Sequence, residues 1–140
     1  MADIRKLTDN LSVAPQLVGA DFEEIRRLNF RSILCNRPDR EEQGQPDYEE
    51  LRKQAEAAGL AVKFQPVNGA NISDDDVDDF EENITELPQP VLAYCRTGTR
   101  CTVLWALSEA SKQPVDDILE TASKAGYALD ALKPRILDRE

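Results

Sequence analysis

The stretch from Pro88 to Leu107, PQPVLAYCRTGTRCTVLWAL, constrains the fold of this chain more than any other part of the sequence. Its apolar run at 91–94 follows a proline, which predicts a short buried strand. A turn containing Gly98 comes next, and the mostly apolar segment 101–110 predicts a helix. A buried strand that turns directly into an apolar helix is typical of a sheet covered by helices.

The turn itself, Cys95 to Arg100, has the composition of an anion-binding loop. A glycine turn can point successive backbone N–H groups inward, and the following helix N-terminus adds partial positive charge. This field would hold Cys95 as a thiolate, the reactive form of cysteine, while Arg100 clamps the anion with its planar donors. Arg96 lies either at the rim of the site or free in solvent. The backbone donors are expected from Thr97, Gly98 and Thr99.

Strand and helix patterns alternate along the rest of the chain. Strands are expected at 4–7, 11–17, 31–35, 60–67 and 91–94, with the first two near an edge because Pro15 suits an edge strand. Helices are expected at 21–28, 47–58, 73–87, 101–110 and 114–125, followed by a short helical turn around Leu129 and Leu132. This order predicts a single α/β domain over 1–140: three layers, with a mostly parallel sheet whose carboxyl edge binds the ligand.

Composition excludes several functional classes. The 140 residues carry 27 acidic and 17 basic side chains, a net charge of −10, which argues against nucleic acid or a membrane surface as partner. The start, MADIRKLTDN, lacks the apolar core of a signal peptide, so a cytoplasmic protein is expected. The chain has no histidine, which excludes Ser-His-Asp and Cys-His catalysis and histidine-based zinc sites. No metal or cofactor is therefore expected.

Scattered motifs resemble one family. The loop Cys-Arg-Thr-Gly-Thr-Arg is similar to the rhodanese loop, because a protein tyrosine phosphatase has five residues between cysteine and arginine rather than four. The segments 12–16, 35–39 and 65–69, with Tyr127, resemble the DUF442 or β-lactamase hydrolase-like family, which has a phosphatase-like domain. The resemblance implies a fold like that of dual-specificity phosphatases. It also implies a persulfide dioxygenase as a partner, since such domains occur fused to one.

The leaving group separates the candidate reactions. Hydrolysis of a phosphate ester expels an alkoxide that needs a proton, and the matching phosphatase segment, 67–71, has no carboxylate before Asp74. The acidic run 74–76 is better explained by stabilisation of the helix dipole. Sulfur transfer needs no such proton, so a rhodanese-like sulfurtransferase with a Cys95 persulfide is the favoured expectation. The alternatives are a phosphatase acting through a cysteinyl-phosphate, and an inert module that senses anions or binds a partner. In both enzymatic cases the substrate is a small anion, a sulfane-sulfur donor or a phosphate ester.

Other residues have secondary expectations. Cys35 ends a strand near the loop, and resemblance to phosphoinositide phosphatases implies a reversible disulfide with Cys95; core packing is the alternative. Cys101 is expected to pack in the core, while the Thr102 hydroxyl supports the site. Asn68 and Arg37 are expected around the site, and for Arg37, together with Asp39 of the same loop, a structural salt bridge is equally supported.

Overall fold

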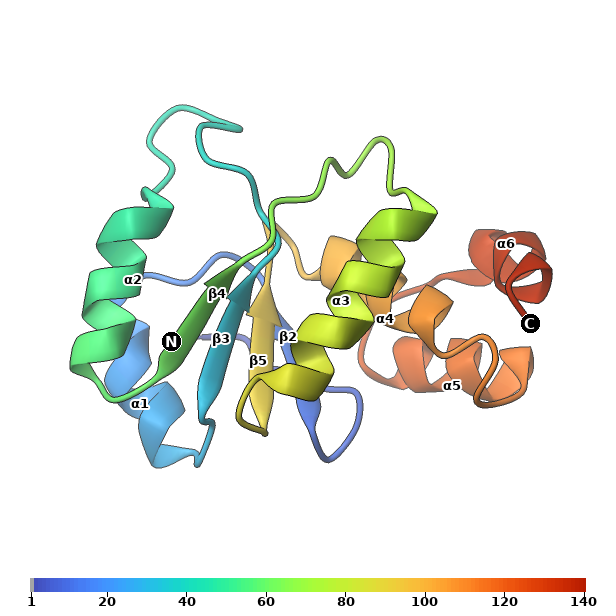
Figure 1. The fold of residues 1–140 in the computed structure, drawn as a ribbon, viewed down its shortest axis with the longest axis horizontal. Coiled ribbons are helices and arrows are strands. Elements are labelled where there is room, and N and C mark those ends of the chain that lie inside the picture. The colour runs from blue at the N-terminus through green and yellow to red at the C-terminus, as the bar shows by residue number, and fades with distance from the viewer. Residues whose placement is uncertain (1) are drawn as a thin grey trace.

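The computed structural model describes residues 2–140, and its centre is a five-stranded sheet (Figure 1). The strand order is β1-β2-β5-β3-β4, in which β1 runs antiparallel to β2 and the other neighbours are parallel. The strands are β1 Arg5–Lys6, β2 Leu11–Ala14, β3 Ser32–Cys35, β4 Ala61–Phe64 and β5 Val91–Tyr94. The prediction of an α/β fold with a mostly parallel sheet is confirmed.

Helices cover both faces of this sheet, which makes three layers (Figure 1). One face carries α1 Phe22–Arg27, preceded by the 3₁₀ turn Gly19–Asp21, and α2 Tyr48–Ala57. The other face carries α3 Asp74–Glu86, α4 Thr99–Ser108, α5 Val115–Lys124 and α6 Lys133–Asp138, the last preceded by a 3₁₀ turn, Asp130–Leu132. None of the helices within 2–140 combines the length and the apolar composition needed to cross a bilayer.

Strand β5 is apolar throughout because both of its faces are buried. Successive side chains of a strand point to opposite faces, so Val91, Ala93 and Cys95 join the core under α3 and α4. Leu92 and Tyr94 join the second core, under α1 and α2. The central position of β5, between β2 and β3, places the loop that follows it in the middle of the carboxyl edge of the sheet.

Three predictions of local structure were wrong. Strand β2 lies inside the sheet, between β1 and β5, and it ends at Ala14, so Pro15 follows the strand instead of lying on an edge. The helix after the loop begins at Thr99, two residues earlier than expected. The tail forms α6 rather than only a turn, because Ile136 is fully buried and anchors this last helix in the core.

Candidate active site

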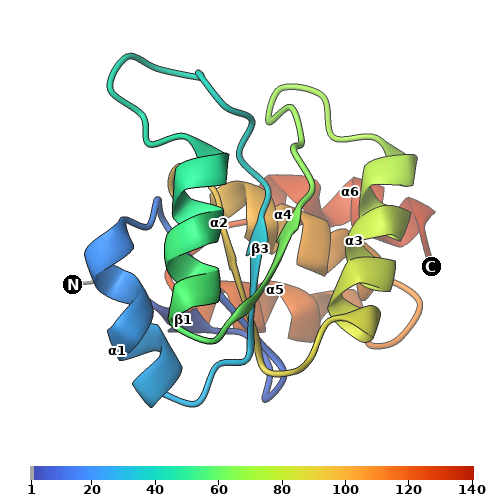
Figure 2. The ribbon, with the colours of Figure 1, turned by 60° about the vertical axis from the view of Figure 1, so that its left-hand side comes forward.

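Three loops leave the carboxyl edge of the parallel strands, where Figure 2 shows those after β3 and β4 rising above the sheet; Arg100, after the third, donates to the carbonyls of Asn36 and Val67 in these two. They follow β3, β4 and β5, and they begin at Asn36, Gln65 and Cys95. The meeting point contains a hollow of about 310 Å³ at the first turn of α4. Its lining consists of Gly69, Ile72, Cys95, Arg96, Thr97, Thr99, Arg100 and Val103. Most of the predicted loop, together with two residues after β4, therefore forms one site.

Cys95 lies at the floor of this hollow, with only 1% of its surface exposed. The backbone N–H of Gly98 donates to Cys95 Sγ at 3.1 Å. A hydrogen bond from the Cys101 thiol, supported by the backbone N–H groups of Cys101, Thr97 and Gly98, lowers the pKa of Cys95 to about 6 although burial opposes ionisation. At neutral pH the sulfur is therefore mainly a thiolate, the nucleophilic form.

Gly98 gives the loop its shape. Its φ of 89° lies in the left-handed region, which favours glycine. A Cβ at this position would collide with the hydroxyl of Tyr127, which lies against the loop and donates to the Thr97 carbonyl at 3.2 Å. The Thr102 hydroxyl donates to the Gly98 carbonyl at 2.8 Å, so this predicted supporting residue acts on the loop backbone.

Arg100 is fixed at the entrance of the hollow by two loops. Its Nη1 donates to the Val67 carbonyl at 2.9 Å and lies 3.0 Å from Oε2 of Glu41. Its Nη2 donates to Oε1 of Glu41 at 3.2 Å. A Cβ at Gly69 would lie 3.0 Å from Nε of Arg100, so glycine leaves this edge of the guanidinium clear. Arg100 is therefore oriented before any anion binds.

A network of charges behind Arg100 contains two glutamates that were not expected there from the sequence, Glu41 and Glu42. Arg37 is 2% exposed and donates to Gln16, Glu41 and Glu42, each at 3.0 Å. Glu41 joins this buried arginine to Arg100. Although partial burial opposes its ionisation, hydrogen bonds from Arg100 and Arg37 hold the pKa of Glu41 below its ordinary value. Of the two alternatives for Arg37, the structure has the salt bridge: Arg37 lies outside the lining of the hollow and contacts Arg100 through Glu41.

The remaining predicted residues occupy mixed positions. Arg96 lies at the rim, where its Nη2 is 3.4 Å from Oε2 of Glu42. The Thr99 backbone N–H donates to the Thr97 hydroxyl at 3.3 Å instead of into the cradle. Asn68 lies outside the lining and accepts a hydrogen bond from the Ala70 backbone, so it shapes the loop after β4. Cys101 supplies the donor that the sequence argument overlooked, even though it is buried in the core as predicted.

The structure does not bring Cys35 and Cys95 together. Cys35 is paired in register with Tyr94, so its side chain joins the core under α1 and α2, whereas Cys95 belongs to the opposite core. The Cys35 thiol donates to the Arg37 carbonyl at 3.3 Å, and burial raises its pKa to about 11. A disulfide would require one of the two side chains to leave its core. Cys101 is the thiol that lies beside Cys95.

The acidic run at the start of α3 has structural partners. Asp74 Oδ1 lies 3.0 Å from Nη1 of Arg139 and 3.6 Å from Nη2 of Arg135, which fastens α3 to the C-terminal helix. Asp76 accepts from the Ser73 backbone and forms a capping box with it. These contacts agree with the structural interpretation of the run.

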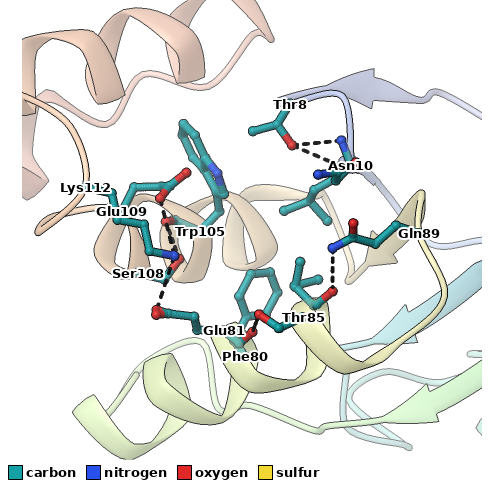
Figure 3. Close-up of a pocket in the computed structure, with 12 residues that line it drawn as sticks. Thr8, Asn10, Phe80, Glu81, Thr85, Gln89, Trp105, Ser108, Glu109 and Lys112 are labelled. Atoms are coloured by element: carbon teal, nitrogen blue, oxygen red, sulfur yellow. Dashed lines mark hydrogen bonds and ion pairs between the residues drawn. The ribbon is translucent and has the colours of Figure 1, made fainter.

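A second hollow, of about 190 Å³, lies at the opposite edge of the sheet between α3, α4 and the β1–β2 turn (Figure 3). Its charged groups pair with one another, since Lys112 Nζ lies 3.4 Å from Glu81 and 3.8 Å from Glu109. The Ser108 hydroxyl donates to the Trp105 carbonyl at 2.7 Å. No cysteine lines this hollow. The chemistry therefore belongs to the Cys95 hollow.

Comparisons with known proteins agree with this geometry. A model of the family described as "Beta-lactamase hydrolase-like protein, phosphatase-like domain" matches residues 3–112. A β-lactamase hydrolase-like protein of Agrobacterium fabrum is 38% identical over 137 residues, which make up 96% of this chain and 32% of that protein. The chain thus spans about a third of the length of this relative.

Solved structures extend the comparison to the fold. A crystal structure of NMA1982 from Neisseria meningitidis Z2491, described as a candidate phosphatase, has 42% identity and a TM-score of 0.91, with 99% of each chain covered. The core catalytic domain of the PP-IP phosphatase SIW14 from S. cerevisiae, in complex with citrate, has a TM-score of 0.74 at 19% identity, covering 97% of this chain and 83% of that one. At 19% identity, the similarity to SIW14 shows a shared fold alone.

Proposed function

Because this chain belongs to the β-lactamase hydrolase-like protein, phosphatase-like domain family, we propose that it is a phosphatase that uses Cys95 as its nucleophile. The observation that carries this proposal is the cradle itself. A sulfur whose pKa is about 6 accepts an N–H bond from Gly98, on the same loop as a pre-oriented Arg100. Backbone donors and an arginine fork match the oxygens of a phosphoryl group.

The reaction proceeds in two displacements. The Cys95 thiolate attacks phosphorus, the bond to the leaving oxygen breaks, and that oxygen departs with the electron pair. Water then attacks the cysteinyl-phosphate, the P–S bond breaks, and inorganic phosphate leaves while Cys95 returns as a thiolate. A low thiol pKa favours both steps, because a thiolate of pKa about 6 is a nucleophile at neutral pH and also a good leaving group.

Arg100 serves both displacements by stabilising the equatorial oxygens of the phosphoryl group. Its Nη1 is held by Val67 and Glu41 and its Nη2 donates to Glu41, whereas its Nε, on the edge beside Gly69, has no hydrogen-bond partner among residues 2–140. Arg96, at the rim, adds positive charge where an anion enters. Three arginines, Arg37, Arg96 and Arg100, balance the Cys95 thiolate and the two carboxylates that pair with them, Glu41 and Glu42, so the site is locally neutral within a chain that is acidic overall.

The sulfurtransferase expectation finds no support among the relatives, which are described as phosphatases or phosphatase-like. The anionic ligand of the distant neighbour SIW14, citrate, is consistent with a cradle for small anions. A persulfide dioxygenase partner rests on the resemblance of the sequence alone. Phosphoryl transfer is therefore the reaction to test first, with sulfur transfer as the competing outcome.

We expect the protein to release phosphate from an aryl phosphate, with kcat/KM falling about tenfold for each pH unit below a midpoint of about 6. The sign follows from the nucleophile: above this pKa Cys95 is a thiolate, and below it the thiol is protonated and inactive. The rate of alkylation by iodoacetamide, measured without substrate, should follow the same curve. Cys35 and Cys101 do not interfere, because burial raises the pKa of each thiol.

Two results would overturn this proposal. Thiocyanate formed from thiosulfate and cyanide, without phosphate release from the aryl phosphate, would establish sulfur transfer. An alkylation midpoint near 8.5, the value of an ordinary cysteine, would identify an inert module instead.

A further inference from the structure

Among residues 2–140, the lining of the hollow around Cys95 contains no carboxylic acid or phenol that could protonate a leaving oxygen. Besides the nucleophile, only Arg96 and Arg100 ionise among the residues of its lining. A guanidinium does not release its proton at neutral pH. The nearest phenol, Tyr127, is outside the lining, its hydroxyl donates to the Thr97 carbonyl, and burial raises its pKa.

The carboxylates of the surrounding loops are also engaged elsewhere. Glu41 bridges Arg37 and Arg100, so it is ionised and carries no proton to donate. Glu42 lies 3.0 Å from Arg37 Nη2 and 3.4 Å from Arg96. Asp39 accepts from the Tyr48 backbone at 2.9 Å at the start of α2.

The loop after β4, which forms the opposite wall, contributes no acid. It runs from 65 to 73 as Gln-Pro-Val-Asn-Gly-Ala-Asn-Ile-Ser, without a carboxylate. The first acid beyond it, Asp74, is paired with Arg135 and Arg139 of the C-terminal segment. Asp76 caps α3 through Ser73. Among the residues of the described part of the chain, 2–140, that line the hollow, none is a carboxylic acid.

Without an acid in the site, the leaving group departs as an anion and must be stable in that form. An alkoxide is a poor leaving group without a proton, because its conjugate acid is very weak. A phenoxide with an electron-withdrawing substituent, a carboxylate or a phosphate departs as a stable anion and needs no acid. The substrates with these leaving groups are aryl phosphates, acyl phosphates and phosphoanhydrides, and in each of them the bond that breaks is a P–O bond.

We propose that this site acts on phosphoryl donors whose leaving group departs as an anion, and that it discriminates against alkyl phosphates such as phosphoserine. The inference rests on the proposed phosphatase function and specifies its substrate class. Cys95 supplies the electron pair for the new P–S bond, and the leaving group takes the pair of the broken P–O bond without a proton from the protein. Any proton that the departed anion takes up comes from solvent, and the water that hydrolyses the cysteinyl-phosphate releases its proton to solvent.

The test is the dependence of kcat/KM on the leaving group. We expect kcat/KM to fall about tenfold for each unit rise in leaving-group pKa along a series of substituted phenyl phosphates. Phosphoserine should give no measurable phosphate above the buffer blank. Acetyl phosphate and pyrophosphate, assayed alongside, distinguish acyl donors from anhydride donors within the class.

Variants of two acids on neighbouring elements sharpen this test: Glu41 of the loop after β3 and Asp75 of the first turn of α3. Glu41→Gln and Asp75→Asn should retain the same slope, whatever their absolute rates, because neither carboxylate donates the proton. A slope that steepens in either variant would identify that residue as an acid and overturn the inference. A shallow slope in the native protein, with phosphoserine hydrolysed at a rate like that of phenyl phosphate, would overturn it while leaving the phosphatase proposal intact. Phosphate release from none of the donors would end both proposals.

Discussion

A Cys95→Ser variant is expected to release phosphate from an aryl phosphate at least about 10⁴-fold more slowly than the native protein, the order of effect seen when a hydrolase loses its nucleophile. Serine preserves the size of the side chain but replaces a sulfur of pKa about 6 with a hydroxyl that stays protonated. No histidine exists in this chain to act as a base for that hydroxyl. The measurement is kcat/KM for the native and variant proteins under identical conditions.

Cys35→Ser is the matched control, because it makes the same exchange at another buried strand-end cysteine. Cys35 faces the opposite core, so this variant should retain most of the native activity. Trp105 is the only tryptophan and lies in α4, so its fluorescence reports whether each variant is folded around that helix. A folded Cys95→Ser variant with more than about a tenth of the native activity would exclude Cys95 as the nucleophile.

Arg100→Lys should lower kcat/KM by about 10²- to 10³-fold, comparable to removal of one preorganised donor from an oxyanion site. Lysine keeps the positive charge but presents one ammonium instead of a planar fork. It cannot hold the Val67 carbonyl and the Glu41 carboxylate and still offer two parallel donors to a phosphoryl group. Loss of transition-state contacts predicts that kcat falls along with any rise in KM.

The control for this change is Arg52→Lys on α2, where the arginine, among residues 2–140, pairs with Glu49 and Glu56 of its own helix alone. This exchange should leave kcat/KM within about twofold of the native value. If Arg100→Lys behaved like Arg52→Lys, the oriented fork would have no part in catalysis. Arg100 would then only join the loops after β3 and β4.

Local sequence patterns sufficed for the central part of the fold. The run 91–94 lies in the middle of the sheet, where both faces of a strand are buried. Such a strand is a continuous apolar run, which is easily recognised in the sequence. The cradle after it was also predictable, because Cys95, Gly98 and Arg100 lie within six residues of sequence and Gly98 donates directly to Cys95. The start of α4 was misplaced since Gly98 can precede a helix directly, and the sequence does not reveal its positive φ.

The parts that were missed depend on contacts between distant segments. Glu41 reaches Arg100 across 59 positions of sequence, and neither side chain has a local signal of that pairing. The interior place of β2 depends on its pairing with β5, 80 residues later. The role of Cys101 was hidden for another reason: a buried helical cysteine looks like core packing, and only its position beside Cys95 shows that its thiol is a donor.

The covalent state of Cys95 during turnover tests the central claim most directly. Native protein mixed with an aryl phosphate and quenched rapidly in acid should yield the Cys95 peptide carrying one phosphoryl group, detected by mass spectrometry. Cys35 and Cys101 peptides should remain unmodified, and the Cys95→Ser protein should give no such adduct. A Cys95 peptide that gains one sulfur atom from thiosulfate, and never a phosphoryl group from the phosphate donor, would contradict the account and show that the cradle carries sulfur.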